Sequence, residues 1–240
     1  PEPAPFEEKP NPTSWLSHVN QNDEFIVRFG KETVVYWWDG TTEPALDYDG
    51  SREKEAGVNW CEYYCHWSPQ GSYLATLVPP KGVILWSGAK YEKVGRFVAP
   101  GVRHVLFSPN EEYLITNNDN PNDPAAIKVY HVGTGKLLRA FSLFPDGVSP
   151  KDGPPSPFLW SHDGAYLART GKNLISIFET PSMKLLDKRS LSAPGIHEFQ
   201  WSPKANILAY WGPELNNSPA HVDLIELPSR QQLRQKNLFN

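Results

Sequence analysis

The chain contains the stretch His66-Trp67-Ser68-Pro69-Gln70-Gly71-Ser72-Tyr73-Leu74-Ala75-Thr76, and close variants of it occur three more times. The variants begin at Leu106-Phe107-Ser108-Pro109, Leu159-Trp160-Ser161-His162 and Gln200-Trp201-Ser202-Pro203. Each ends in a short apolar stretch led by a tyrosine or an isoleucine. Strand-rich repeats spaced by roughly 40–50 residues are typical of the blades of a β-propeller.

Each repeat is predicted to form four antiparallel strands. The first strand ends at the Trp or Phe, a turn of Pro, Gly, Asp and Asn residues follows, and the Tyr-Leu-Ala stretch is the second strand. The third strand is apolar on both faces, as in Val83-Ile84-Leu85-Trp86, which indicates a sheet covered on both sides. The fourth is more polar, which suits an outer edge. The sequence therefore predicts an all-β fold, a propeller of four-stranded antiparallel blades.

About five blades are expected. We interpret residues 1–14, rich in proline, as a linker. Residues 15–240 are predicted to form a partial WD40-like propeller, with blades at 15–50, 58–100, 101–145, 155–192 and 195–240. Insertions at 117–124 and 142–157 break the repeat period, and we expect both to be exposed loops. Since residue 1 is a proline, we expect the chain to be a piece of a longer protein.

Composition limits the function classes. A hydrophobic share of 39% with 12% aromatic residues suffices for a large core. A net charge of −4 is not typical of a dedicated nucleic-acid binder. The longest apolar runs are too short to span a membrane, so no membrane association is expected. Cys61 and Cys65, placed in one strand, would lie about 13 Å apart, beyond disulfide reach, which favours a reduced, cytoplasmic compartment.

Four aromatic residues, Trp67, Phe107, Trp160 and Trp201, occupy the same position of the repeat. Large aromatic side chains at equivalent positions favour packing between blades, so we interpret the four as structural blade anchors. Stacking of the tryptophans on a ligand is the alternative.

A basic cluster lies on the fourth strand of the second repeat. Lys90, Lys93 and Arg96 alternate there with Tyr91 and Phe97. Bases interleaved with aromatics can bind RNA or an acidic partner, so the three bases are candidate contact residues. The alternative is that they are charges that protect a solvated blade edge from pairing.

The sequence contains no recognisable motif of a phosphate-binding, metal-binding or catalytic site. Gly133-Thr134-Gly135-Lys136 lacks the first glycine of a phosphate-binding loop and is predicted to be a hairpin turn. The histidines are scattered, and no Gly-x-Ser-x-Gly elbow occurs. We therefore expect no enzyme activity, metal, cofactor or small-molecule substrate.

The run Phe178-Glu179-Thr180-Pro181-Ser182-Met183-Lys184-Leu185-Leu186 resembles the family of the b subunit of eukaryotic translation initiation factor 3. Further stretches similar to that family are Asp23-Glu24-Phe25-Ile26-Val27-Arg28, Gly82-Val83-Ile84-Leu85-Trp86, Leu227-Pro228-Ser229-Arg230-Gln231 and Arg234-Gln235-Lys236-Asn237-Leu238-Phe239-Asn240. The resemblance covers most of 15–240. One departure is Ser87-Gly88-Ala89-Lys90-Tyr91, which replaces a Gly-Gly-Glu-Lys-aromatic run of the family.

The resemblance implies a nine-bladed propeller, of which this chain would hold about half. It implies a non-enzymatic scaffold that helps to dock the factor on the small (40S) ribosomal subunit, near the side at which mRNA enters. The implied partners are the a, g and i subunits of the factor and the small ribosomal subunit, through its protein and ribosomal RNA.

Two other assignments stay open at this point. Trp-Ser-Pro-x-Gly repeats also occur in propellers that gate serine peptidases, which would require a hydrolase domain outside this chain. Initiation factor 2A has a similar propeller.

Overall fold

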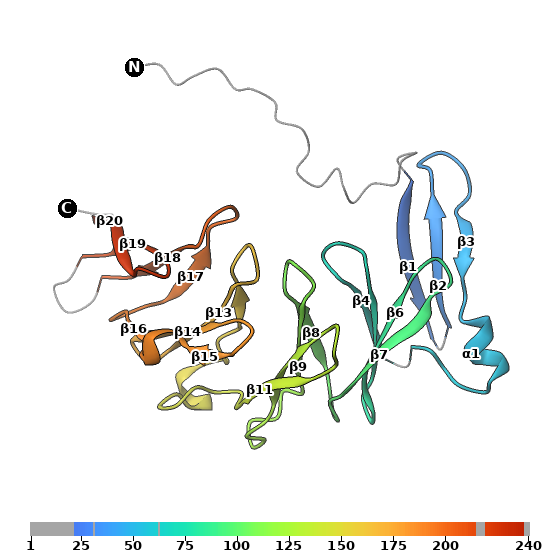
Figure 1. Cartoon of the computed structure of the whole chain (residues 1–240), viewed down its shortest axis with the longest axis horizontal. Coiled ribbons are helices and arrows are strands. Elements are labelled where there is room, and N and C mark those ends of the chain that lie inside the picture. The colour runs from blue at the N-terminus through green and yellow to red at the C-terminus, as the bar shows by residue number, and fades with distance from the viewer. Residues whose placement is uncertain (1–21, 31, 62, 215–218, 238–240) are drawn as a thin grey trace, which may run out of the picture.

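The computed structural model describes residues 22–30, 32–61, 63–214 and 219–237, without the side chains of 234–237. These residues form five antiparallel sheets that follow one another along the chain. The sheets lie side by side in an open arc, with the first and the last at opposite ends (Figure 1). The all-β propeller prediction is confirmed. The predicted linker 1–14 lies outside the described residues.

We name the sheets blades one to five in chain order. Blade one contains β1 (Asp23–Phe29), β2 (Glu32–Trp38) and β3 (Ala45–Tyr48), followed by helix α1 (Ser51–Glu55). Blade two contains β4 (Tyr64–Trp67), β5 (Leu74–Val78), β6 (Gly82–Ser87) and β7 (Glu92–Val98). Blade three contains β8 (His104–Phe107), β9 (Tyr113–Asn117), β10 (Ile127–His131) and β11 (Leu137–Phe141). Blade four contains β12 (Leu159–Trp160), β13 (Tyr166–Gly171), β14 (Leu174–Glu179), β15 (Lys184–Leu185) and β16 (Leu191–Ser192). Blade five contains β17 (Glu198–Trp201), β18 (Ile207–Gly212), β19 (His221–Glu226) and β20 (Gln231–Asn237).

The serine of the repeated phrase closes the turn between the first two strands. In blade three the Ser108 N–H donates to the Tyr113 carbonyl at 2.9 Å, and the Ser108 hydroxyl accepts from the Tyr113 N–H at 3.0 Å. Ser68 with Tyr73 and Ser161 with Tyr166 repeat both bonds. All three serines are buried. The hydroxyl thus satisfies a backbone donor that would otherwise lack a partner.

The hydrophobic core lies between the blades. Four clusters of buried residues each join two neighbouring blades, in the order one–two, two–three, three–four and four–five. Leu85 of blade two and Leu114 of blade three, for example, share one cluster and are at most 1% exposed. This arrangement explains why third strands such as β6 carry apolar residues on both faces.

Blade four departs from the expected four continuous strands. The fourth strand, predicted as one outer strand in each repeat, is here broken into β15 and β16 by a 3₁₀ turn at Leu186–Lys188. Arg230 of blade five donates to the Leu186 carbonyl at 2.6 Å and forms an ion pair with Asp187 at 3.0 Å. The side chain of Leu186 is buried in the cluster between blades four and five. A contact from the next blade therefore stabilises the break.

The insertion at 142–157 also differs from the expectation of an exposed loop. Its first part enters the core, where Leu143 is 5% exposed beside Phe158. The Ser156 hydroxyl accepts from the Thr170 N–H at 3.1 Å, which ties the end of the insertion to blade four. Most of the exposed residues of this segment lie in its middle, around the short 3₁₀ helix Pro150–Asp152.

The two cysteines are closer than a shared strand would allow. Cys61 precedes β4 and only Cys65 lies in it, so the spacing argument for their separation is wrong. Both are free thiols. A hydrogen bond from Cys65 lowers the pKa of the Cys61 thiol to about 7, against burial, which raises it.

No helix in the described part of the chain is both long and apolar enough to cross a bilayer.

Candidate functional site

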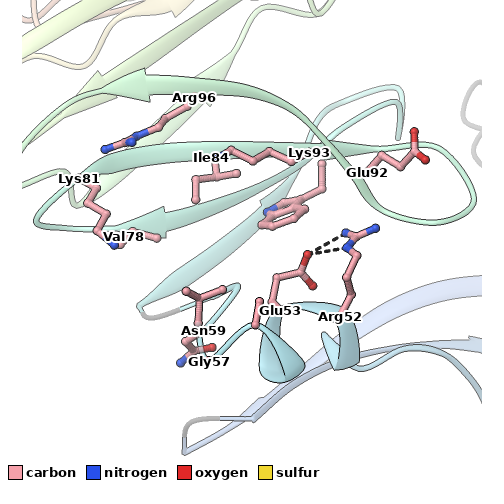
Figure 2. Close-up of a pocket in the computed structure, with 13 residues that line it drawn as sticks. Arg52, Glu53, Gly57, Asn59, Val78, Lys81, Ile84, Glu92, Lys93 and Arg96 are labelled. Carbon is pink, nitrogen blue, oxygen red and sulfur yellow. Dashed lines mark hydrogen bonds and ion pairs between the residues drawn. The ribbon is translucent and has the colours of Figure 1, made fainter.

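A groove of about 800 Å³ lies between helix α1 and one face of blade two (Figure 2). Apolar side chains of β5 and β6, namely Val78, Ile84 and Trp86, form part of its lining. The charged residues that line it are Arg52, Glu53, Lys81, Glu92, Lys93 and Arg96. The groove therefore combines an apolar surface with a predominance of bases.

Trp60 holds the helix side of the groove in place. Its indole N–H donates to the Thr33 carbonyl of blade one at 3.1 Å, and its ring contacts Trp86 edge-on, with centroids 5.8 Å apart. Gly50, which precedes α1 at φ 74°, lies so close to Trp60 that a Cβ atom there would be 2.4 Å from the ring. Helix α1 is thus fixed between blades one and two by a buried aromatic residue.

A β-bulge brings Lys93 and Arg96 to the same face of β7. Residues three apart in a regular strand point to opposite faces. The pairing of β6 with β7 shifts between Leu85 and Trp86, so that Lys93 lies opposite Trp86 while Arg96 lies opposite Ile84. Because Ile84 and Trp86 are two apart and share a face, their partners also share it.

The bases of the groove differ in their partners. Arg52 forms an ion pair with Glu53 at 2.8 Å and donates to the Tyr91 carbonyl at 2.6 Å. The Tyr48 hydroxyl also bonds to the Glu53 carboxylate. Within the described ranges, by contrast, Lys81, Lys93 and Arg96 form no ion pair, and all three are exposed. Lys81 and Arg96 lie at the end of the groove away from Arg52 (Figure 2).

Lys90 is separated from the other two candidate bases. It lies in the turn between β6 and β7 and does not line the groove, although its carbonyl accepts from Arg52 at 3.4 Å. The neighbouring rings point inward, since Tyr91 is 4% and Phe97 1% exposed. These aromatics are core residues, so the interleaved pattern does not create a surface on which bases could stack.

The four repeated aromatics lie at blade interfaces. Trp160 stacks on Tyr113 and Trp201 on Tyr166, in each case across two neighbouring blades. Phe107 is 3% exposed in the cluster between blades two and three. Trp67 is half-buried beside Tyr91 and also lines a second hollow, which lies outside the basic groove.

Sequence reasoning missed Lys81 and helix α1. The available signal for the helix was the run of charged helix formers at 52–55. Among the residues that the structure describes, no group of three or more His, Cys, Asp or Glu side chains is arranged to hold a metal ion.

The chain is similar to the B subunit of eukaryotic translation initiation factor 3 from several organisms. It is 40% identical over 245 residues to the Xenopus laevis protein, covering 100% of this chain and 33% of that protein. It is 36% identical over 267 residues to the Schizosaccharomyces pombe protein, covering 98% and 36%. The Aedes aegypti protein is 36% identical over 244 residues, covering 100% and 33%. The chain thus spans about a third of the length of these curated relatives. No model of a known protein family matches the chain.

A solved structure shares the fold. A crystal structure of a eukaryotic initiation factor superposes with a TM-score of 0.65, covering 91% of this chain and 52% of that chain at 21% identity.

Proposed function

This chain belongs to the family of the B subunit of eukaryotic translation initiation factor 3 over the third of those proteins that it spans, and from that premise we propose that it acts in translation initiation. We infer a non-catalytic scaffold whose blades are part of a nine-bladed ring. The ring helps to dock the multi-subunit factor on the small ribosomal subunit, near the side at which mRNA enters. The a, g and i subunits of the factor and the small ribosomal subunit are its partners, and the cytoplasm is its compartment.

The unpaired bases of the groove carry the docking proposal. Lys81, Lys93 and Arg96 are exposed cations without a carboxylate partner among the described residues, in a chain of net charge −4. Such cations suit phosphate oxygens of ribosomal RNA, whose bound counterions are released on contact. Because Tyr91 and Phe97 are buried, the contact would be to the RNA backbone and not to stacked bases.

The relatives favour this function over the two rivals. The similar proteins from frog, fission yeast and mosquito all carry the name of this initiation factor 3 subunit, and not the name of a peptidase or of initiation factor 2A.

Charge reversal of the groove tests the proposal. In the full-length protein, the triple variant Lys81→Glu, Lys93→Glu and Arg96→Glu is expected to bind purified small ribosomal subunits more weakly. The slope of log K against log salt should also fall by up to about two to three, because each lost phosphate contact contributes about 0.7–0.9. Binding is measured by sedimentation or fluorescence anisotropy at several salt concentrations.

The matched control reverses three exposed lysines remote from the groove, Lys136, Lys151 and Lys204. It changes the net charge equally, so it should leave the salt slope closer to that of the wild type. If both triple variants lower the slope equally, only the overall charge matters and the groove is not the docking surface. If the groove variant binds small ribosomal subunits as tightly as the wild type does, the groove is likewise not the docking surface.

A further inference from the structure

A second hollow, of about 420 Å³, lies between blade one and the turns of blade two. Its lining has two carboxylates, Glu24 on β1 and Asp47 on β3. Four aromatic side chains also line it, namely Trp37, Trp67, Trp86 and Tyr91. The remaining lining comes from the turns at 71–72 and 87–89, whose residues are small. The hollow shares Trp86 with the basic groove, but its acids and its other aromatic rings do not line that groove and have no part in the function proposed above.

Among the described residues, the Tyr91 hydroxyl is a hydrogen-bond donor that both carboxylates share. The Tyr91 hydroxyl bonds to Asp47 at 2.7 Å and also contacts Glu24. A phenol has one proton, so it can donate to only one carboxylate at a time. In the part of the chain that the structure describes, no lysine, arginine or histidine forms an ion pair with either acid. The pair therefore has unmet capacity to accept hydrogen bonds from a cation.

Burial and the charge of Asp47 raise the pKa of Glu24, while the bond from Tyr91 acts in the opposite direction. A raised pKa is the response of a carboxylate that lacks a compensating positive charge. A bound cation would supply that charge.

The aromatic side of the hollow offers ring faces and not polar groups. The indole N–H of Trp86 donates to Thr76 at 2.8 Å. The indole N–H of Trp67 is shielded from solvent and has no acceptor among the described residues, so a ligand in the hollow does not reach it. Trp37 and Trp67 are half-buried, so part of each ring is open to a ligand.

We propose that this hollow binds the arginine side chain of a partner protein. A guanidinium has five donors in a planar fork, which suits two adjacent carboxylates better than the compact ammonium of lysine. Its plane also stacks on aromatic faces, such as those of the half-buried Trp37 and Trp67, where cation–π attraction adds to the ion pair. The turn residues Gly71, Ser72 and Gly88 leave the approach to the hollow free of large side chains.

The test uses the full-length protein and three short peptides, acetyl-Gly-Gly-Xaa-Gly-Gly-amide with arginine, lysine or citrulline as Xaa. Binding is followed by saturation-transfer NMR and titration calorimetry. We expect millimolar binding of the arginine peptide and at least tenfold weaker binding of the citrulline peptide, which has the same shape without the charge. The lysine peptide should bind several-fold more weakly than the arginine peptide.

Two variants locate the binding. Glu24→Gln and Asp47→Asn should each weaken binding of the arginine peptide about tenfold. Glu43→Gln, an exposed carboxylate elsewhere in blade one, should change nothing. Near-ultraviolet circular dichroism checks that each variant is folded.

Equal binding of the citrulline peptide, or unchanged binding to folded Glu24→Gln and Asp47→Asn proteins, would overturn the proposal. Equal binding of the lysine peptide would overturn the assignment to arginine. The experiment contains no ribosome, so its failure is distinct from failure of the docking proposal.

Discussion

Trp160 lies flat against Tyr113, with ring centroids 5.6 Å apart and an interplanar angle of 19°. Tyr113 belongs to the second strand of blade three and Trp160 to the first strand of blade four. Tyr166 and Trp201 repeat the contact one blade later, at 6.1 Å and 13°. The tyrosine of one repeated phrase therefore meets the tryptophan of the next, so the phrase that defines a blade also defines how blades join.

Trp160→Ala should lower the free energy of unfolding by about 3–5 kcal/mol, the usual cost of removing a large aromatic from a packed core. Chemical denaturation of the full-length protein measures the change. Val98→Ala, which truncates a side chain that is 63% exposed on β7, is the control and should have little effect. A Trp160→Ala protein that unfolds like the wild type but loses a partner would instead identify Trp160 as a contact residue.

Ser161→Ala should destabilise the protein by about 1–3 kcal/mol, because the Tyr166 N–H loses its acceptor in a buried turn. The Ser161 hydroxyl accepts from that N–H at 2.9 Å and is fully buried. Ser202 occupies the equivalent position in blade five, yet its hydroxyl accepts only a long bond of 3.4 Å from Lys204. Ser202→Ala should therefore cost less than about 0.5 kcal/mol. Equal costs at the two positions, measured by urea unfolding, would show that the hydroxyl bond is not the stabilising element.

Gly71 and Gly164 are equivalent turn residues with φ of 74° and 73°, but their surroundings differ. A Cβ at Gly164 would lie 2.6 Å from Asn110 of blade three, whereas one at Gly71 meets nothing within 4 Å. Gly71→Ala should cost about 1–2 kcal/mol through backbone strain alone. Gly164→Ala should cost about 1 kcal/mol more, because the Asn110 side chain also has to move away from its hydrogen bonds with Ser108 and Glu112. Thermal unfolding of the two variants compares them, and the reverse order would contradict the contact with Asn110.

The propeller was predictable because its signals are local and repeated. Serine, the turn formers after it and the Tyr-Leu-Ala strand lie within about ten residues of one another, and the structure confirms the fold that they predict. The broken outer strand of blade four was not predictable in this way. Its cause is Arg230, which lies in another blade and 44 residues from the Leu186 carbonyl that it contacts.

The composition of the groove was only partly predictable. Lys90, Lys93 and Arg96 were grouped because they are close in sequence, but the face that a side chain occupies depends on the pairing of strands. The bulge between Leu85 and Trp86 places Lys93 and Arg96 together, and the β5–β6 turn adds Lys81. A bulge is a property of the hydrogen-bond ladder and leaves no clear mark in an alternation of residue types. The contact role of these bases and the blade boundaries stay predictions.

Glu24→Gln should stabilise the protein at neutral pH, even though it is expected to weaken binding at the arginine site. Burial and the charge of Asp47 hold the pKa of Glu24 above its ordinary value, so the folded state keeps this proton to higher pH than the unfolded state does. The free energy of unfolding therefore falls as the pH rises from about 4.3, the unfolded pKa of glutamate, through the folded pKa.

Below both pKa values Glu24 is protonated in either state, so the variant and the wild type should differ little in stability there. Their difference should grow with rising pH and level off above the folded pKa. Urea unfolding between pH 4 and pH 8 measures it, with Glu43→Gln expected to give a flat difference. A difference of opposite sign would mean that a cation of the protein already compensates Glu24. Arginine peptide at a concentration near its wild-type Kd should stabilise the wild type at pH 7 by more than it stabilises Glu24→Gln, because the charge that destabilises the empty site is the one that binds the ligand.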